Sequence, residues 1–249
     1  MKKERVNPFE RGGANYVQNR PTYPLSLLNF LVDQCDQHEK ALDVGCGNGQ
    51  LSCLLATRFH KVFATDPSAE QISNAIPGKG VIYHCEAAER IRIDTLDVDL
   101  VVAAQAAHWF NLEKFYTEVS RISRSGTILA LICYGVPEIE GKIGETFHNF
   151  YWGEIHDHWP EERKHVESGY SDIYFPFKEL VMPTFAIEKQ WTLFELCGYI
   201  DTWSAVQAAV DKNKVAIINS FKNILAKKWG CPTTQHLVKW PLYGKVTRY

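Results

Sequence analysis

The sequence predicts an α/β fold with a doubly wound, mostly parallel sheet. Residues 40–134 alternate short apolar runs with segments of helical spacing, an arrangement typical of βαβ units. The runs are almost wholly apolar, as expected for strands that helices cover on both faces. A glycine-rich turn follows the first run directly, as at the ligand-binding edge of many open α/β sheets.

The pattern predicts five strands and three helices within this region. The strands are expected at Ala41–Val44, Val62–Thr65, Val81–His84, Asp99–Ala104 and Thr127–Cys133. The helices are expected at Gln50–Phe59, Ser68–Ala75 and Leu112–Ile122. The segment Asp66-Pro67-Ser68 supplies both the end of the second strand and a cap for the helix that follows it.

The alternation stops after Tyr134. Residues 135–182 are too long for an ordinary loop and too aromatic for a linker, so we expect a helical, aromatic cap inserted after the fifth strand. Beyond it, periodicity predicts a strand at Phe185–Trp191, a helix at Lys214–Lys228 and a terminal strand or hairpin at His236–Tyr249. One domain over residues 1–249 is expected, with an N-terminal arm (1–35), a core (36–134), the cap (135–182) and C-terminal helices and strands (183–249).

Composition and charge argue against several classes of protein. The chain has 249 residues with 27 Lys and Arg against 29 Asp and Glu, and this balance gives no reason to expect nucleic acid or membrane as a partner. Its longest uncharged apolar run, Ile128–Val136, is far too short to span a bilayer. The N-terminus lacks a secretory pattern, so we expect a cytoplasmic protein. Seven cysteines without a Cys-x-x-Cys pair predict reduced thiols and no metal site.

The clearest functional signal lies at the end of the first predicted strand. An acid, Asp43, precedes the turn Gly45-Cys46-Gly47-Asn48-Gly49, which lets the backbone approach a ligand just before a helix begins. Asp66 ends the second strand, where a carboxylate accepts both hydroxyls of a ribose. The sequence therefore predicts a ligand that contains a nucleoside.

Two cofactor classes compete for this arrangement, nicotinamide dinucleotides and S-adenosylmethionine. The dinucleotide fingerprint is Gly-x-Gly-x-x-Gly/Ala, but here the third glycine falls one position early and Gln50 takes its place. Asp43 also suits a cationic amino group better than a pyrophosphate, which it would repel. Both observations favour S-adenosylmethionine, with S-adenosylhomocysteine as the product, and disfavour a nicotinamide enzyme.

From Tyr16 to Cys133 the chain resembles the class I S-adenosylmethionine-dependent methyltransferases of the type 11 subgroup. Within it, the sequence is similar to the small-molecule enzymes that include the trans-aconitate methyltransferases. The resemblance implies a Rossmann-like sheet of seven strands and in-line methyl transfer to a small molecule, a carboxylate or another oxygen nucleophile. The motifs that carry it are Asp43–Gly49, Asp66-Pro67-Ser68, Ala88-Glu89 and Gln105–Phe110.

The resemblance also implies which residues hold the cofactor. The loop from Gly45 to Gly49, with Asp43 beside it, is implied to hold the methionine portion, Asp66 the ribose and Pro67 the adenine. The family has an acid before the alanine that matches Ala88, but Ala87 stands there in this chain, which leaves the Ala88 N–H to bind the adenine ring. An arm with Tyr16 and Arg20 is implied to fold over the cofactor, with Arg20 at the methionine carboxylate. Gln105 follows the fourth strand, and its position at the carboxyl edge of the sheet is expected to put it beside the cofactor.

The acceptor side is less determined. His108 and Trp109 follow the fourth strand and are expected near the methyl group, with His108 as the candidate general base. A carboxylate acceptor is already ionised at pH 7 and needs no base, so the acceptor stays open at this point. Trp109, Phe147, Tyr151 and Trp152 are candidate walls of the substrate pocket. The histidines and acids of residues 154–165 match no metal motif and are expected to form a solvated surface.

Two other functions remain open beside a small-molecule methyltransferase. A protein or RNA methyltransferase tends to carry an added basic or docking module, which we do not recognise in this sequence. A non-catalytic S-adenosylmethionine-binding protein would lose the arm or the segment after the fourth strand, and both are present. Residues 211–249 hold eight Lys and Arg and a single acid, Asp211, and form either a solvated surface or a basic rim that attracts an anionic substrate.

Overall fold

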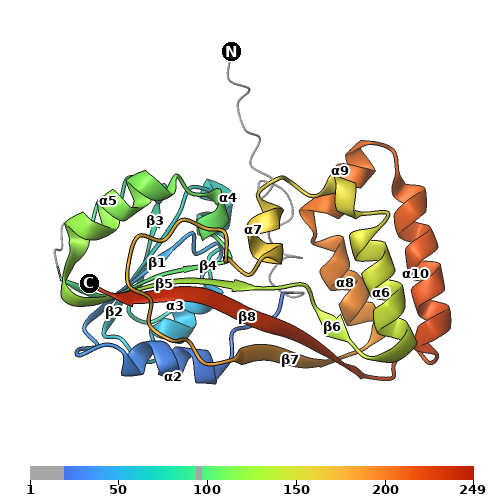
Figure 1. Cartoon of the computed structure of the whole chain (residues 1–249), viewed down its shortest axis with the longest axis horizontal. Helices are drawn as coiled ribbons and strands as arrows, with labels where there is room; N and C mark the ends of the chain where they lie inside the picture. The colour runs from blue at the N-terminus through green and yellow to red at the C-terminus, as the bar shows by residue number, and fades with distance from the viewer. Residues whose placement is uncertain (1–19, 94–96) are drawn as a thin grey trace, which may run out of the picture.

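The structure is a computed structural model that describes residues 20–93 and 97–249. One eight-stranded sheet forms its centre, in the order β3-β2-β1-β4-β5-β8-β6, with β7 paired to β8 (Figure 1). Strands β1 to β5 are parallel, and β8 is antiparallel to β5. The predicted fold class is confirmed. The strands are β1 (Lys40–Val44), β2 (Lys61–Asp66), β3 (Val81–Cys85), β4 (Val98–Ala104), β5 (Ser123–Tyr134), β6 (Glu138–Ile139), β7 (Phe185–Trp191) and β8 (His236–Arg248).

Helices cover both faces of the parallel part of the sheet. Helices α2 (Leu25–Asp33) and α3 (Gln50–Leu55) lie on one face, and α4 (Ala69–Ser73) and α5 (Leu112–Ile122) lie on the other (Figure 1). Helix α5 has the predicted bounds because its apolar residues recur at helical spacing and are buried, and because the Asn111 side chain accepts a hydrogen bond from the Lys114 N–H. The helix predicted at Gln50–Phe59 ends earlier, at Leu55, and is followed by a tighter turn in which the N–H groups of Thr57 and Arg58 bond to the carbonyls three residues back.

A helical lobe packs beside the sheet and comes from two separate parts of the chain (Figure 1). The first part follows β5 and supplies α6 (Gly141–Trp152) and the 3-10 turn η2 (His156–His158). The next helix, α7 (Arg163–Glu167), packs on the sheet half instead, where its Val166 is buried with residues of α5 and β4. The second part lies between β7 and β8 and supplies α8 (Leu193–Asp201), α9 (Ser204–Asp211) and α10 (Val215–Trp229). The two parts are joined by apolar packing, for example by the stacked rings of Phe150 and Phe221, whose centroids are 3.8 Å apart. The lobe is therefore larger than the cap expected from residues 135–182.

The end of that predicted cap belongs to the core instead. Tyr170 and Ile173 are buried with the apolar residues of α5 and β4, and Leu180 forms a β-bridge with Val246. Strand β8 connects the two halves of the molecule. Its first residues pair with β7, and its last residues pair with β5, so one continuous strand fixes the helical lobe against the carboxyl end of the sheet.

Candidate active site

A cavity of about 610 Å³ lies between the sheet and the helical lobe. One wall is formed by residues just beyond the carboxyl ends of β1, β2, β4 and β5, and the other by residues around η2 and α9. Its volume is in the range that holds one drug-sized ligand. Ten of the residues predicted from the sequence line it: Arg20, Asp43, Gly45, Cys46, Gly47, Asn48, Asp66, Pro67, Gln105 and Trp109.

The glycine loop after β1 has a backbone conformation that depends on its three glycines. Gly45, Gly47 and Gly49 all have positive φ angles, of 71°, 55° and 86°, which glycine adopts without strain. The N–H groups of Gly45 and Cys46 both donate to the Thr65 carbonyl, at 2.7 and 3.0 Å. The loop is thereby fixed to the end of β2, and its backbone borders the cavity.

The Asp66 carboxylate is oriented by two backbone donors. The Gly47 N–H and the Ser68 N–H donate to its two oxygens, at 2.9 and 2.8 Å. A carboxylate oxygen accepts more than one hydrogen bond, so both oxygens keep the capacity to bind ligand hydroxyls. Asp66 is thus fixed at the cavity in the position expected of a ribose-binding acid.

Asp43 is a buried acid at the opposite end of the loop. Its side chain is 1% exposed and accepts a hydrogen bond of 2.6 Å from the Ser52 hydroxyl. Burial raises the pKa of Asp43 to about 7; the Ser52 hydrogen bond lowers it and the nearby Asp66 charge raises it. A cationic group in the cavity would lower this pKa again and hold Asp43 as a carboxylate, so the site favours a ligand with a positive charge at this point.

Three predicted cofactor residues lie outside the cavity lining. Gly49 faces Tyr83, whose hydroxyl oxygen would lie 2.0 Å from a Cβ at this position, so the glycine serves close packing. Ala87 and Ala88 are also absent from the lining, and the carboxylate of neighbouring Glu86 accepts a hydrogen bond from the Arg92 N–H. Ala87 and Ala88, which were predicted to lie at the adenine, therefore do not contact this cavity.

Gln50 and Gln71 line the cavity and were not predicted from the sequence. Gln71 lies on α4, in the first turns after Asp66, and the oxygen of its side-chain amide lies 3.8 Å from the position of a Cβ on Gly47. The sequence could have indicated Gln71, because it lies three residues after Ser68 in the first turn of the predicted helix. The Ser68 hydroxyl caps this helix and accepts a hydrogen bond from the Gln71 N–H.

Arg20 lies before α2, and its side chain contacts both halves of the molecule. Its guanidinium donates to the Tyr134 hydroxyl at 2.8 Å and to the Thr202 carbonyl at 3.3 Å, and it lies 5.4 Å from the centroid of the Tyr199 ring. Arg20 therefore lies at the cavity where β5 meets the helical lobe. Tyr16, the other residue predicted for the arm, lies outside the described residues.

His108 does not line the cavity, although its neighbour Trp109 does. Both belong to the 3-10 turn η1 (Ala107–Trp109), in which successive side chains point in different directions. The Nδ1 atom of His108 lies 2.9 Å from the Tyr170 hydroxyl. Burial, together with the charges of Arg163 and His165, lowers the pKa of His108 to about 3, so the imidazole is a weak base. The sequence placed this side chain near the methyl group, and the structure turns it away.

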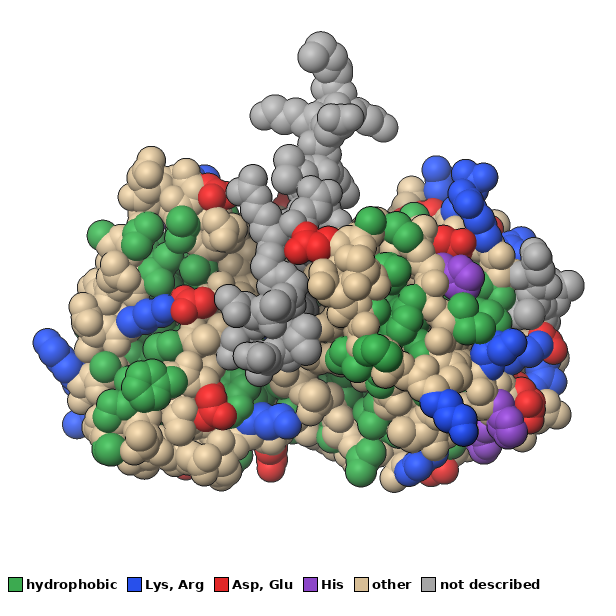
Figure 2. Space-filling model, turned by 180° about the vertical axis from the view of Figure 1, so that it is seen from behind, with side chains coloured by type: hydrophobic (Ala, Val, Ile, Leu, Met, Phe, Trp, Pro, Cys, Tyr) green, Lys and Arg blue, Asp and Glu red, His purple; other side chains and the backbone are tan. Residues whose placement is uncertain are grey.

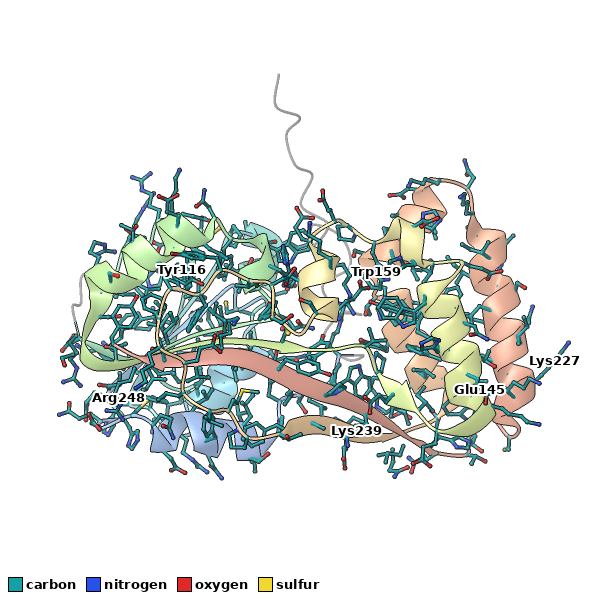
Figure 3. All side chains as sticks on the ribbon, viewed as in Figure 1. Tyr116, Glu145, Trp159, Lys227, Lys239 and Arg248 are labelled. Atoms are coloured by element: carbon teal, nitrogen blue, oxygen red, sulfur yellow. The ribbon has the colours of Figure 1, made fainter. Side chains whose placement is uncertain are left out.

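The predicted aromatic walls also differ from those observed. Phe147 and Tyr151 are buried inside the helical lobe against Trp203, and Trp152 is 43% exposed. Trp109 does line the cavity as predicted, and on the opposite wall the aromatic surface is supplied by Trp159, which lies between the two halves of the molecule (Figure 3).

His158 lies next to Trp159 in the lining and is only 7% exposed. The expectation of a solvated surface over residues 154–165 is therefore wrong at His158, because α9 packs on η2 and covers it. Among the described residues, no group of three His, Cys, Asp or Glu side chains is arranged to hold a metal ion.

Several residues of the lining carry buried polar atoms without a partner in the described part of the chain. Such atoms are rare in folded proteins and point to a missing ligand or water. They are grouped at both walls of the cavity, which fits a ligand with donors and acceptors along its length. The atoms are Asn48 Nδ2, Gln71 Oε1, Gln105 Oε1, His158 Nδ1 and Trp159 Nε1.

Comparison with known proteins identifies the family. A family model described as a methyltransferase domain matches residues 42–131, from β1 to β5. A Dictyostelium discoideum protein named as a methyltransferase is 34% identical over 219 residues, which cover 86% of this chain and 83% of that one. The chain belongs to the class I S-adenosylmethionine-dependent methyltransferases. The resemblance to the trans-aconitate enzymes within this family stays a prediction.

Two further comparisons agree with the methyltransferase family. The structure of a protein described as a type II methyltransferase from Anaeromyxobacter dehalogenans superposes with a TM-score of 0.86 at 37% identity, and covers 92% of this methyltransferase and 97% of that chain. A Saccharomyces cerevisiae protein named for S-adenosylmethionine-dependent methyl transfer is 34% identical over 134 residues, which are 50% of this chain and 46% of that one. In the described part of the methyltransferase, no helix is long and apolar enough to cross a membrane.

Proposed function

We propose that this methyltransferase binds S-adenosylmethionine at the glycine loop and Asp66 and transfers the methyl group to an oxygen of a small molecule, a carboxylate or a related oxygen nucleophile. The observation that carries the proposal is the single cavity that joins the glycine loop and Asp66 to the wall formed by the helical lobe. One ligand-sized space thus borders both the predicted cofactor residues and a separate set of side chains.

The residues of the core wall fit the cofactor. We infer that Asp66, held by two N–H donors, accepts the ribose hydroxyls and that Asp43 pairs with the positively charged amino group, because both acids line the cavity. Arg20 is placed to bind the methionine carboxylate, a charge-assisted contact of about 1.5–3 kcal/mol. The unpartnered amide atoms of Asn48 and Gln105 offer one further donor and one acceptor.

S-Adenosylmethionine, when bound, supplies a methyl group on a positively charged sulfur. The chain's contribution is to align the acceptor oxygen with that methyl group and to exclude water. Trp109 from the core and Trp159 from the helical lobe both line the cavity and give it apolar surface for this purpose.

The acceptor class is supported by the placement of His108. A hydroxyl or phenol acceptor benefits from a base with a pKa near the working pH. His108 lies outside the cavity lining and burial lowers its pKa to about 3, so it is a poor base for that step. A carboxylate is ionised at pH 7 and reacts without a base. This contrast favours a carboxylate over a hydroxyl.

The distribution of charge also favours a small acceptor. Figure 2 shows Lys and Arg side chains interspersed with Asp and Glu over the described part of one face, without a continuous basic stripe. Of the basic residues in 211–249, Lys222, Lys245 and Arg248 form ion pairs with Asp201, Glu179 and Asp36. A nucleic-acid acceptor would be expected to meet a basic track instead.

The test is a methyl-transfer screen with S-adenosylmethionine and a panel of small carboxylic acids and hydroxylated metabolites, analysed by mass spectrometry. We expect methyl esters with the wild type and none with Asp66→Ala. Methylation of peptides or RNA without any small-molecule product would support the alternative acceptors. Binding of S-adenosylmethionine without transfer to any class of acceptor would support a non-catalytic protein.

A further inference from the structure

Arg163 of α7 is a half-buried cation at the interface of the two halves of the molecule. Its Nε donates to the Tyr151 hydroxyl at 2.8 Å, and its Cζ lies 4.5 Å from the centroid of the Trp159 ring. A guanidinium has five N–H donors, and this hydrogen bond uses one of them. Within the described residues Arg163 forms no ion pair with a carboxylate; Glu167 is reached only through the Tyr151 hydroxyl, which donates to it at 2.7 Å.

Arg163 acts on the cavity through Trp159. The Trp159 ring lines the cavity, and its Nε1 has no hydrogen-bond partner among the described residues. An indole N–H only donates, so the atom that satisfies it is an acceptor such as a ligand oxygen. The Arg163 cation is attracted to the face of the Trp159 ring, and its positive charge strengthens the attraction of the Trp159 N–H for a ligand oxygen.

A second cation faces the same interface from the other side. Arg20 lines the cavity and donates to the Tyr134 hydroxyl, while Arg163 is on α7 and contacts Trp159. Glu162 also lines the cavity and carries the opposite charge. If Arg20 binds the cofactor carboxylate, Arg163 is a second cation beside the cavity, in contact with the Trp159 ring.

We propose that the methyl acceptor is an organic anion whose charged group binds to the Trp159 N–H, with Arg163, stacked on that ring, as a positioning residue that supplies positive charge. This inference rests on the proposed function. The recognised charge is separate from the oxygen that is methylated, because a guanidinium on the reacting oxygen would stabilise the substrate more than the transition state, in which that charge is consumed. The site therefore selects organic acids whose reacting oxygen and recognised carboxylate are different groups.

The test compares carboxylates with amides of nearly the same shape. Protein saturated with S-adenosylhomocysteine is titrated calorimetrically with glutarate against glutaramate and with 4-hydroxyphenylacetate against 4-hydroxyphenylacetamide. For at least one pair we expect the wild type to bind the probe with the extra carboxylate about ten-fold more tightly. Arg163→Gln should bind the two members of that pair alike, and Arg163→Lys should keep part of the preference.

Three controls separate recognition from folding. Arg58→Gln removes an exposed arginine of the core, which contacts Asn29, and should leave the preference unchanged. Arg163→Gln should bind S-adenosylhomocysteine within about two-fold of the wild type, which shows an intact core. Trp159→Phe keeps the ring but removes the N–H. It identifies the Trp159 indole proton in NMR spectra, and that signal should move downfield when the preferred carboxylate is added to the wild type.

Two results would overturn the inference. One is a wild type that binds the carboxylate and the amide alike in every pair. The other is an Arg163→Gln variant that binds S-adenosylhomocysteine normally and keeps the preference for the carboxylate. A wild-type protein that fails to bind S-adenosylhomocysteine would instead refute the proposed function, so the two failures are distinguishable.

Discussion

Gly47→Ala separates ligand binding from folding at the glycine loop. Gly47 has a φ of 55°, so an alanine there costs about 1–2 kcal/mol of backbone strain. Its Cβ would meet only the side-chain oxygen of Gln71, at 3.8 Å, which is ordinary van der Waals contact. Gly141 is a matched control, because it has a φ of 64° and nothing within 4 Å of its Cβ position. Both variants should melt about 2–8 °C below the wild type.

Only Gly47→Ala should lose affinity for the cofactor, because Gly47 lines the cavity and Gly141 does not. A methyl group added where a bound ligand touches the backbone costs about 1–3 kcal/mol, which corresponds to a roughly 5- to 150-fold weaker Kd for S-adenosylhomocysteine. Thermal denaturation and isothermal titration of the three proteins measure both quantities. Wild-type affinity in Gly47→Ala, or a far larger loss of stability than in Gly141→Ala, would refute the placement of the ligand.

Three further predictions concern stability. Gly49→Ala should lower the free energy of unfolding in urea by about 2–4 kcal/mol, because the new Cβ would lie 2.0 Å from the Tyr83 hydroxyl oxygen; a cost equal to that of Gly141→Ala would contradict this. Burial raises the pKa of Asp43 to about 7, so between about pH 4 and 7 the native state holds a proton on Asp43 that the unfolded state has lost. The stability of the wild type relative to Asp43→Asn should therefore fall as the pH rises through that range. A pH-independent difference in Tm between the two proteins would argue against it. Asp99→Ala should cost about 3 kcal/mol in urea, because buried Asp99 accepts from the N–H groups of Glu39 and Lys40, at 2.7 and 2.9 Å, and pairs with Arg124; a loss below about 1 kcal/mol would count against that network.

The core of the fold was predictable because its signals are local. Each strand from β1 to β5 contains a short apolar run, although β5 begins four residues before the predicted Thr127, and the bounds of α5 follow from its spacing and from Asn111. The glycine loop and Asp66 were predictable for the same reason, since a strand end, a turn and a helix start are adjacent in sequence. The parallel order of the strands then brings Asp66 and the loop together at one edge.

The helical lobe and its wall were not predictable because they depend on contacts between distant parts of the chain. Packing of α9 on η2 buries His158, and nothing in residues 154–165 alone shows that cover. Phe147 and Tyr151 are aromatic residues of a suitable spacing, but they pack on Trp203, more than fifty residues later, and not on the cavity. Gly49 matched a loop motif, but its lack of a side chain is required by Tyr83 on β3.

The most direct test of the central claim is calorimetric titration of the purified protein with S-adenosylmethionine, S-adenosylhomocysteine and NADH. Asp66→Ala is the paired variant, and Asp201→Ala, an exposed acid on α8 that pairs with Lys222, is the control. We predict that the wild type and Asp201→Ala bind both sulfur compounds but not NADH, and that Asp66→Ala, folded by its melting curve, binds at least ten-fold more weakly. Binding of NADH, or of neither class by the folded wild type, would contradict the account.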